Sequence, residues 1–551
     1  MGNQRKKTPG FLTQGIILAA ASIIVRLIGL VYRIPLTNIL GDEGNAFYSN
    51  AFEVYNIALL LSSYSIPLAV SKLVSARKQR QEHTNSYRVF KSAMIFTAII
   101  GIIVSLLVYF GADFISSTLM KMPMSSYALK VLSPCLFIVA VLGVVRGYFQ
   151  GLGTTVPTAV SQVLEQIVNA VVSIVAASYL FKVGGALIEA KNNALLDSAY
   201  GAAGGTLGTV AGAFTALLFM GLVFAAYYGI IKKKMLREEK EEQEVESYQE
   251  IIKVLVLTII PVVMSTAIYN INSIIDQSVY NNIMAMQGYT QEEYASLWGM
   301  FTGKYKVLLN VPLGISSALA VSVIPSLTAA VAIKKRRLVH ERIGMAIRFA
   351  MLIAMPSFVA FAVFASPILQ LLFGDARKTP AWILSLGALA VIVFCLSTIT
   401  NAILQGINQM TKPIHNALIS LGIHLVVLLV LMVGLKWNIF AIVISNIVFG
   451  TSMCILNSIA IRRSVKYHQE IKTTFVLPFI SAVIMGVVSY VFYLLFRLFL
   501  SPRIALLPVM LIAGIVYVVC LFLTKALTET EVLAMPKGHK LVDLFKKFRL
   551  L

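Results

Sequence analysis

The stretch SIPLAVSKLVSARKQRQ (65–81) resembles a second stretch of the same chain, VIPSLTAAVAIKKRRLV (323–339). In both, an apolar segment with one early proline, Pro67 or Pro325, runs into a cluster of basic residues. Such a transition from apolar to basic residues is typical of a membrane-spanning helix that reaches the cytoplasm. The pair therefore indicates a membrane protein with an internal repeat.

A second pair of stretches supports the repeat. FQGLGTTVPTAV (149–160) resembles LQGINQMTKPIHNAL (404–418), at a separation of roughly 256 residues against roughly 258 for the first pair. With six spanning helices in each copy, both halves have the same orientation. The axis that relates them should therefore run along the membrane normal.

The composition excludes a water-soluble fold. The chain has 551 residues, of which 58% are hydrophobic and 13% charged, and its mean hydropathy is +0.83. An average soluble domain is about 25% charged. A span needs about 20 apolar residues, so fourteen spans would use roughly 280 to 350 residues and leave short loops and a modest tail.

Hydropathy predicts fourteen spanning helices. The predicted fold class is an all-α integral membrane protein with two pseudo-symmetric six-helix lobes and a C-terminal helix pair. The segments lie at 11–37, 47–74, 91–115, 127–150, 156–181, 199–231, 251–278, 297–332, 343–366, 380–405, 413–435, 437–461, 474–500 and 503–525.

The repeat and the hydropathy divide the chain into five parts. The segment between the lobes is rich in Lys and Glu, and we interpret it as a solvated helical tether. The parts are an N-lobe at 1–231, a cytoplasmic linker at 232–250, a C-lobe at 251–461, helices 13 and 14 at 462–526, and a basic cytoplasmic tail at 527–551.

The charge distribution predicts the topology. Lys and Arg number 46 against 24 Asp and Glu, a net charge of +22. Most basic residues fall in alternate loops on the side of the N-terminus, which predicts that both termini are cytoplasmic. We attribute the positive charge to topology and expect no nucleic-acid partner.

Six basic residues lie away from the ends of the predicted spans, where a charge costs about 2.5 to 3.5 kcal/mol and should face a partner or a wet cavity. A polar stripe with spacings of 4, 3 and 4 residues occupies one face of the first helix. Its arginines either face a substrate, with Glu53 as a further substrate-binding candidate, or pair with acids such as Glu53 to hold helices together. The stripe is Ser22, Arg26, Gly29 and Arg33, and the other embedded cations are Arg146, Lys304, Lys306 and Arg348.

Embedded polar residues also occur on later helices. Glu165 lies among amide side chains and either carries protons or joins a hydrogen-bond network between helices. Lys304 and Lys306 are two residues apart and cannot both face one way. The first helix of the second copy repeats the stripe spacing with Ser265, Tyr269, Asn272 and Asp276.

Signals for covalent chemistry are weak. The external loops are short and hold no paired carboxylates beside a histidine, and neither the four cysteines nor the six histidines show metal-binding spacing. We therefore expect a transporter rather than an enzyme, without a metal or an organic cofactor.

With these residues identified, the chain resembles the MurJ/MviN and stage V sporulation protein B group of lipid-linked saccharide flippases, in the multidrug/oligosaccharidyl-lipid/polysaccharide exporter superfamily. The resemblance covers nearly the whole chain and is closest to the Gram-positive branch. It implies two six-helix lobes around a cationic cavity, and a terminal helix pair that forms a lipid-tail groove with the second lobe. The most specific stretches are VRLIGLVYRIPLTNILGDEGNAFY (25–48), IPLAVSKLVSARKQ (66–79) and VRGYFQGLGTTVPTAVSQVLEQIV (145–168).

The resemblance also implies substrate-binding residues. Arg26 matches the family's first arginine of helix 1, whereas Tyr32 occupies the place of the second, so that Arg33 stands one residue after it. The family's arginine on helix 8 corresponds to Lys304 or Lys306 in this chain. A lysine ammonium there replaces the guanidinium group, which can form two parallel hydrogen bonds.

Coupling residues are implied in the same way. Family ion sites draw on helices 7, 11 and 12, which here offer Asp276, Asn416 and Asn446. The family implies alternating access driven by the membrane potential or by a gradient of an ion such as Na⁺ or H⁺.

The function that we predict is a flippase in the bacterial plasma membrane. It moves a polyprenyl-diphosphate-linked saccharide, foremost the peptidoglycan precursor lipid II, from the inner to the outer leaflet. Its partners are this substrate, membrane lipids and cell-wall synthesis proteins. The alternatives are a flippase for another lipid-linked polysaccharide unit and a cation-coupled multidrug antiporter, which would favour acidic rather than basic residues in its cavity.

Overall fold

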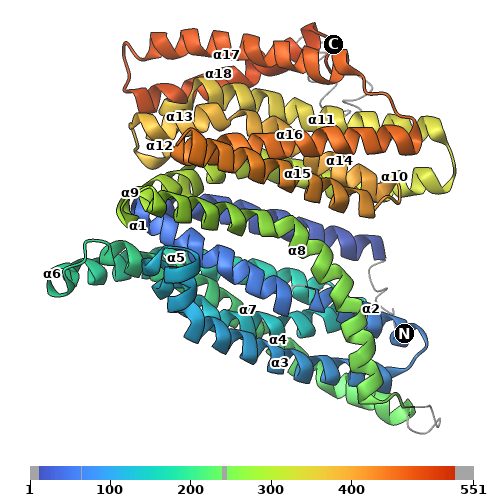
Figure 1. Cartoon of the computed structure of the whole chain (residues 1–551). Coiled ribbons are helices and arrows are strands. Elements are labelled where there is room, and N and C mark those ends of the chain that lie inside the picture. Colours follow the sequence, from blue (N-terminus) through green and yellow to red (C-terminus); the bar gives the residue numbers. More distant parts are fainter. Residues whose placement is uncertain (1–10, 64, 239–244, 528–551) are drawn as a thin grey trace, which may run out of the picture. The chain divides into compact units, whose positions relative to one another are not determined.

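The computed structural model describes residues 11–63, 65–238 and 245–527, and the regular elements in these ranges are all helical (Figure 1). The first nine α-helices are α1 Phe11–Ser62, α2 Ile66–Gln79, α3 His83–Phe114, α4 Ser126–Gly151, α5 Val156–Ala186, α6 Ile188–Lys191, α7 Leu196–Glu238, α8 Tyr248–Met286 and α9 Gln291–Gly299. The others are α10 Lys306–Ala332, α11 Arg336–Val363, α12 Ala365–Phe373, α13 Lys378–Gly387, α14 Leu389–Gly406, α15 Thr411–Leu429, α16 Asn438–Val465, α17 Leu477–Phe496 and α18 Pro502–Leu523. Short π-helical turns include η1 Ile115–Leu119 and η4 Met300–Tyr305.

Twelve segments within the described ranges are long and apolar enough to cross a membrane. The chain is therefore a multi-pass, all-helical membrane protein. One of the twelve, Ala20–Gln79, includes both of the first two predicted helices because α1 continues through the predicted loop. The predicted segment 251–278 forms part of α8 but is not among the twelve. The count of fourteen and the orientation of the termini stay predictions.

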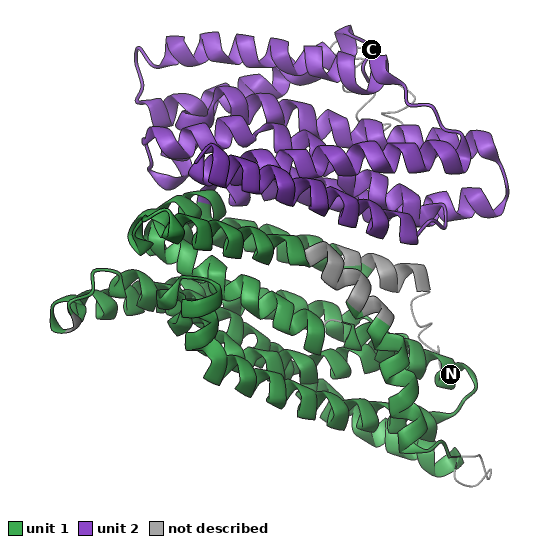
Figure 2. Cartoon of the chain, viewed as in Figure 1, with its two compact units in different colours: residues 1–303 green, residues 304–551 purple. Residues whose placement is uncertain are grey.

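The described helices form two compact units, residues 1–303 and 304–551 (Figure 2). The repeat predicts that α8 begins the second lobe, whereas by its packing α8 belongs to unit 1 together with α9. The compact units are defined by packing, whereas the lobes are defined by the sequence repeat. The division into two six-helix lobes therefore stays a prediction.

Side chains explain why α8 and α9 pack in unit 1. Side chains of α8 and α9 donate hydrogen bonds to three consecutive backbone carbonyls that begin at the last residue of η1. In addition, α9 lies so close to α1 that a Cβ atom at Gly299 would overlap the backbone of Asp42. The carbonyls would otherwise lack helical partners. The donors are Ser278 to Leu119 (3.0 Å), Asn282 to Leu119 (3.0 Å), Asn281 to Met120 (2.8 Å) and Tyr294 to Lys121.

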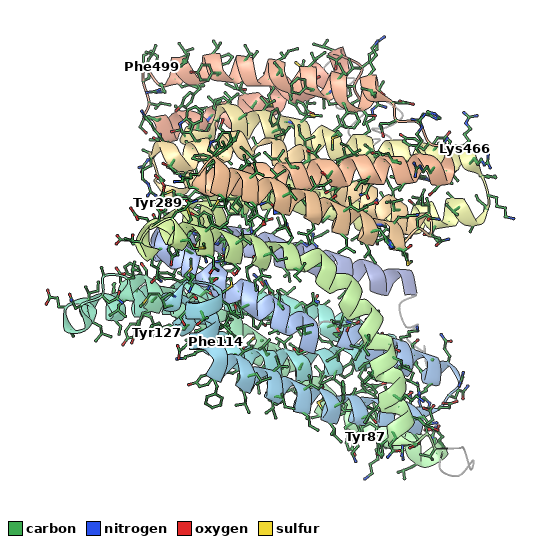
Figure 3. All side chains as sticks on the ribbon, in the orientation of Figure 1. Tyr87, Phe114, Tyr127, Tyr289, Lys466 and Phe499 are labelled. Carbon is green, nitrogen blue, oxygen red and sulfur yellow. The ribbon has the colours of Figure 1, made fainter. Side chains whose placement is uncertain are left out.

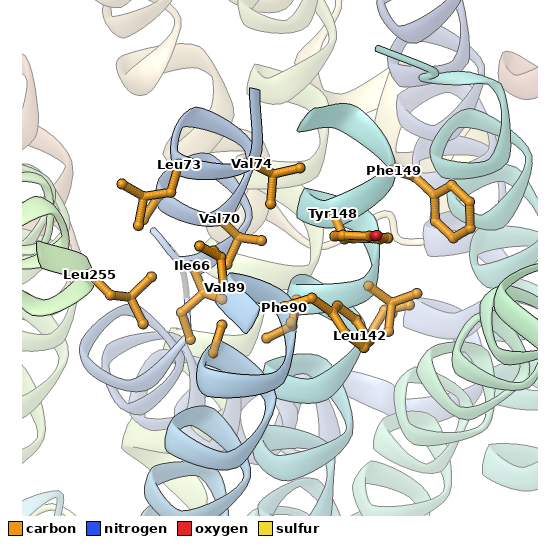
Figure 4. Packing of buried hydrophobic residues seen from close by; sticks show 14 of the residues in the cluster. Ile66, Val70, Leu73, Val74, Val89, Phe90, Leu142, Tyr148, Phe149 and Leu255 are labelled. Carbon is orange, nitrogen blue, oxygen red and sulfur yellow. The ribbon is translucent and has the colours of Figure 1, made fainter. Parts of the chain in front are cut away.

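An apolar cluster holds the ends of α2, α3, α4, α7 and α8 together within unit 1 (Figure 4). Val70 on α2 and Val89 on α3 are fully buried in it, and Phe90 lies 4.8 Å from Tyr148 between ring centres. Burial of aromatic and aliphatic side chains is the main source of such packing energy within a protein.

The two pairs of repeated stretches contact each other in the same way within each unit. In unit 1, α2 packs on α4, where a Cβ at Gly151 would lie 2.8 Å from the Ser71 carbonyl oxygen. In unit 2, α10 packs on α14, and Thr328 donates to the Gly406 carbonyl at 3.2 Å. The repeat is therefore reproduced at the level of helix pairs.

Glycines of α7 allow close approach to α5. An added Cβ at Gly208 would overlap Ser173, and one at Gly212 would lie 2.5 Å from the Glu165 carbonyl oxygen. The small residues at 204, 208 and 212 have the four-residue spacing of a helix-packing stripe, and they form one here.

The linker between α7 and α8 is attached at both of its described ends. Glu238 is buried and accepts a hydrogen bond from the backbone of Thr84 at 2.7 Å, and Glu246 pairs with Arg77. This segment is therefore attached to unit 1 at these residues, and its role as a cytoplasmic linker stays a prediction. The contacts place the predicted cytoplasmic loops of unit 1 at the same end of the unit.

Large apolar side chains cover the outer surfaces of the helices (Figure 3). Phe114 at the end of α3 is 60% exposed and Phe499, between α17 and α18, is 80% exposed. A soluble protein rarely exposes so many contiguous apolar groups, whereas a lipid-facing surface requires them.

Candidate functional site

The first predicted site residue, Arg33, lies beside a break in α1. Gly41 has φ of 66°, which glycine adopts without a steric penalty, and it interrupts the helix. Arg33 precedes the break and Tyr48 follows it, yet the guanidinium carbon lies 4.3 Å from the centre of the Tyr48 ring. This cation–π contact holds the half-buried arginine across the break.

Arg26 lies two turns before Arg33 and is exposed. Between these positions, α1 packs on α5, where Asn169 donates to the Tyr32 hydroxyl at 3.5 Å. In the part of the chain that the structure describes, no carboxylate lies within ion-pair distance of Arg26 or Arg33. The stripe on α1 thus presents two cations without an acidic partner in these ranges.

Glu165, predicted as a coupling or network residue, is paired. Its Oε2 accepts a hydrogen bond from Arg146 on α4 at 2.7 Å, and Arg146 also donates to Ser161 at 2.9 Å. The side chains are 29% and 14% exposed, so the pair is largely shielded from solvent. Sequence reasoning counted Arg146 among the embedded cations but did not identify its partner.

We expect Arg146→Gln to destabilise the protein by about 1.5 to 3 kcal/mol, because Glu165 would lose its charged donor. The double variant Arg146→Gln/Glu165→Gln should recover most of that stability, since no charge is left unpaired. Thermal unfolding of the purified protein measures both effects.

The same double variant separates the two roles of Glu165. If Glu165 belongs to a structural network, as its pairing favours, the double variant should also transport. A variant that is stable but has lost transport would instead assign proton transfer to Glu165.

Lys304 lies in η4 and belongs to unit 2. It is buried, and its Nζ donates to Asp375 Oδ2 at 2.6 Å. Arg377 binds the same carboxylate through its side chain at 2.6 and 2.9 Å and through its backbone N–H at 2.9 Å. Lys304 is therefore part of an ion-pair cluster, which sequence reasoning missed because Asp375 lies in the loop between α12 and α13.

The pKa of Asp375 reflects two opposing effects. Burial raises it, but the hydrogen bonds from Arg377 and Lys304 outweigh burial and hold the pKa of this carboxyl well below its usual range. Asp375 is therefore ionised at any physiological pH, and the charge of Lys304 stays compensated.

Lys306 and Glu53 are half-buried, Lys306 at the start of α10 and Glu53 on α1 beyond the break. Both have polar or electrostatic partners. Their substrate-binding roles stay predictions.

The predicted coupling residues lie in both units. Asp276 is buried on α8 in unit 1, and the side chains of Ser265 and Tyr269 on the same helix lie outside the described residues. In unit 2, Asn446 donates to the Ile442 carbonyl at 2.9 Å, one turn earlier on α16. An ion site that joins these residues stays a prediction.

Asn416 takes part in a buried amide network of unit 2. It donates to Asn457 at 2.8 Å, and Asn457 donates to Thr400 at 3.0 Å and to Asn401 at 2.8 Å. The network connects α14, α15 and α16 and accounts for polar groups that would be unfavourable in an apolar core.

Comparison with known proteins identifies the family. A sequence profile described as "Polysaccharide biosynthesis protein" matches residues 11–331. The chain belongs to this family. The stage V sporulation protein B of Bacillus subtilis (strain 168) is 25% identical to this chain over 479 residues, 87% of this chain and 88% of that protein. The lipid II flippase MurJ of the same bacterium is 26% identical over 433 residues, 76% of each chain.

Solved structures show the fold of this chain. The inward closed conformation of lipid II flippase MurJ matches with a TM-score of 0.65 at 14% identity, over 92% of this chain and 98% of that chain. An inward-facing multidrug resistance MATE family transporter of the MOP superfamily matches with a TM-score of 0.59 at 16% identity, over 82% and 99%. The chain therefore has a MurJ-like fold, shared with MOP superfamily transporters, and is a bacterial multi-pass membrane protein.

Proposed function

We propose that the protein is a flippase for a polyprenyl-diphosphate-linked saccharide, with lipid II as its foremost cargo. It would carry the headgroup from the inner to the outer leaflet by alternating access and would make or break no covalent bond. The observation that carries the proposal is the contrast among embedded cations. Arg146 and Lys304 each have a carboxylate partner, whereas Arg26 and Arg33 have none in the described ranges.

An anionic substrate would complete the charge balance at α1. Cations at membrane depth are costly unless they are paired or solvated. A diphosphate supplies at least two negative charges, and arginine binds phosphate oxygens through two parallel, charge-assisted hydrogen bonds. The similarity to a lipid II flippase over 76% of each chain supports the same class of cargo.

Coupling is part of the proposal. We infer that the membrane potential or a Na⁺ or H⁺ gradient drives transport, with Asp276, Asn416 and Asn446 as the candidate residues. Asp276 is buried in unit 1, and Asn416 is buried and hydrogen-bonded in unit 2. Polar side chains inside the helical units are the kind of group that an ion site needs, which supports these two positions.

Other cargoes remain to be separated by experiment. Any lipid-linked saccharide presents the same diphosphate, so the arginines alone favour none of them. A cationic drug would be repelled by Arg26 and Arg33, so the antiporter alternative is disfavoured.

Rescue of a bacterium depleted of its own lipid II flippases tests the proposal. We expect expression of this protein to restore growth and to restore access of an external lipid II-binding reagent. The control is the same protein with Arg26→Ala, at matched abundance in the membrane. Failure to rescue, with normal membrane abundance, would exclude lipid II as the cargo.

A further inference from the structure

Two adjoining cavities open between α13 and the first turns of α16 in unit 2, each with a volume of about 390 Å³. Leu386 and Phe440 line both, so the two lie side by side. Each volume falls in the range of sites that hold a small molecule, roughly 300 to 1,000 Å³. None of the residues predicted to bind the saccharide substrate lines them.

The mouth of this cavity is marked by tryptophans. Of the three tryptophans in the chain, Trp382 and Trp437 line the cavity and are 64% and 46% exposed. Tryptophan is enriched where a membrane meets water. Both lie near the beginnings of their helices, Trp382 in the first turns of α13 and Trp437 immediately before α16. The mouth is therefore expected at the level of lipid headgroups.

The floor of the cavity is apolar and lies farther along the same helices. Leu386 is one turn beyond Trp382, and Ile444 is about two turns beyond Trp437. Depth increases along both helices, so these residues should lie at the level of hydrocarbon chains. An apolar hollow at that depth has the lining that suits an acyl chain.

The polar end of the cavity offers a cation and an acceptor. Lys436 and Asn438 both line it. Asn438 Oδ1 is buried and has no hydrogen-bond partner among the residues that the structure describes. A buried acceptor without a donor is unfavourable, by about 1 to 3 kcal/mol. A ligand with one anionic group and one hydroxyl would satisfy both residues.

We infer that this cavity binds one anionic glycerophospholipid whose headgroup carries a free hydroxyl. The phosphate pairs with Lys436, the hydroxyl donates to Asn438 Oδ1, and one acyl chain lies along Leu386, Phe440 and Ile444. Trp382 and Trp437 flank the glycerol backbone. This binding site is independent of the proposed transport of a saccharide.

Native mass spectrometry of the purified full-length protein tests the site with three lipids of identical acyl chains. Phosphatidylglycerol has the charge and the hydroxyl, phosphatidylethanol has only the charge, and phosphatidylcholine has no net charge. We expect one phosphatidylglycerol to stay bound, with weaker binding of phosphatidylethanol and still weaker binding of phosphatidylcholine.

Variants assign the contacts. Lys436→Gln should weaken phosphatidylglycerol binding by about fivefold or more, as expected for one basic residue near a lipid headgroup. Asn438→Leu should remove the preference for phosphatidylglycerol over phosphatidylethanol. The matched control is Lys412→Gln, an exposed lysine at the opposite end of α15, which changes the net charge equally.

Two results would overturn the inference. One is equal binding of phosphatidylglycerol and phosphatidylcholine, which would identify ordinary surrounding lipid. The other is the same loss of binding in Lys436→Gln and Lys412→Gln, which would show that overall charge, and not this cavity, selects the lipid.

Discussion

Arg26→Ala is expected to reduce transport of the lipid-linked saccharide at least tenfold while leaving the protein folded. The arginine is exposed on α1 and has no carboxylate partner in the described ranges, so its removal leaves no charge unpaired. A hydrogen bond to a charged group contributes about 1.5 to 3 kcal/mol, or roughly tenfold to a hundredfold in binding. Arg26→Lys should retain part of the activity, because the charge stays but the bidentate geometry is lost.

Arg33→Ala should reduce transport to a similar extent and allows a closer control. Arg497, at the end of α17, also lies over a tyrosine ring, 5.9 Å from the centre of Tyr493. Arg497→Ala removes a comparable arginine–tyrosine contact far along the chain from the stripe, and it should leave transport unchanged.

The measurements are lipid II accessibility at the outer surface and thermal unfolding of each variant. Normal transport by Arg26→Ala and Arg33→Ala would refute a substrate-binding role for α1. A loss of transport that follows a loss of stability would assign the arginines a structural role instead.

Asp375→Asn is expected to lower the free energy of unfolding by about 3 kcal/mol or more, because it removes the carboxylate of a buried ion pair and leaves the charge of Lys304 in place. The side chains of Asp375 and Lys304 are 6% and 8% exposed. Thermal unfolding at neutral pH should therefore show a clear decrease in the midpoint.

The pH dependence of this effect follows from the pKa of Asp375. The pKa is lower in the folded than in the unfolded protein, so the stabilisation is complete above the unfolded value and is lost only as the pH falls through the folded value. The difference between wild type and Asp375→Asn should therefore stay constant between pH 7 and pH 5.

Arg377→Gln is the matched control for this cluster. Arg377 is 51% exposed, and its backbone N–H keeps its bond to Asp375 in the variant. An exposed cation contributes at most about 1 kcal/mol, so this change should be small. Equal effects of Arg377→Gln and Asp375→Asn would mean that the pair with Lys304 does not stabilise the fold.

Features with a local cause were predictable from the sequence. Apolar runs predict spanning helices because backbone groups in lipid must be satisfied within the helix. The glycines of α7 predict a close helix contact through their four-residue spacing, and the structure places α5 there.

Features that depend on distant partners were not predictable in the same way. Nothing in the spacing near Asp375 connects it to Lys304, 71 residues earlier in the chain. The cation–π contact of Arg33 arises from the break at Gly41, which returns Tyr48 to the same region. The start of helix α9 was predictable from the sequence, because Thr290 and Glu293 have the spacing of a capping box and form one. The packing of α9 on α1 was not, because it depends on the close approach of Gly299 to Asp42.

The attachment of α8 and α9 to unit 1 has a consequence for biosynthesis. A ribosome that has completed the first 231 residues has made every helix of the first repeat, but not the side chains that bind the carbonyls of Leu119, Met120 and Lys121. Unit 1 therefore cannot reach its final packing until α9 has emerged and Gly299 is available to meet Asp42. The first half of this protein matures only after synthesis of the second half has begun.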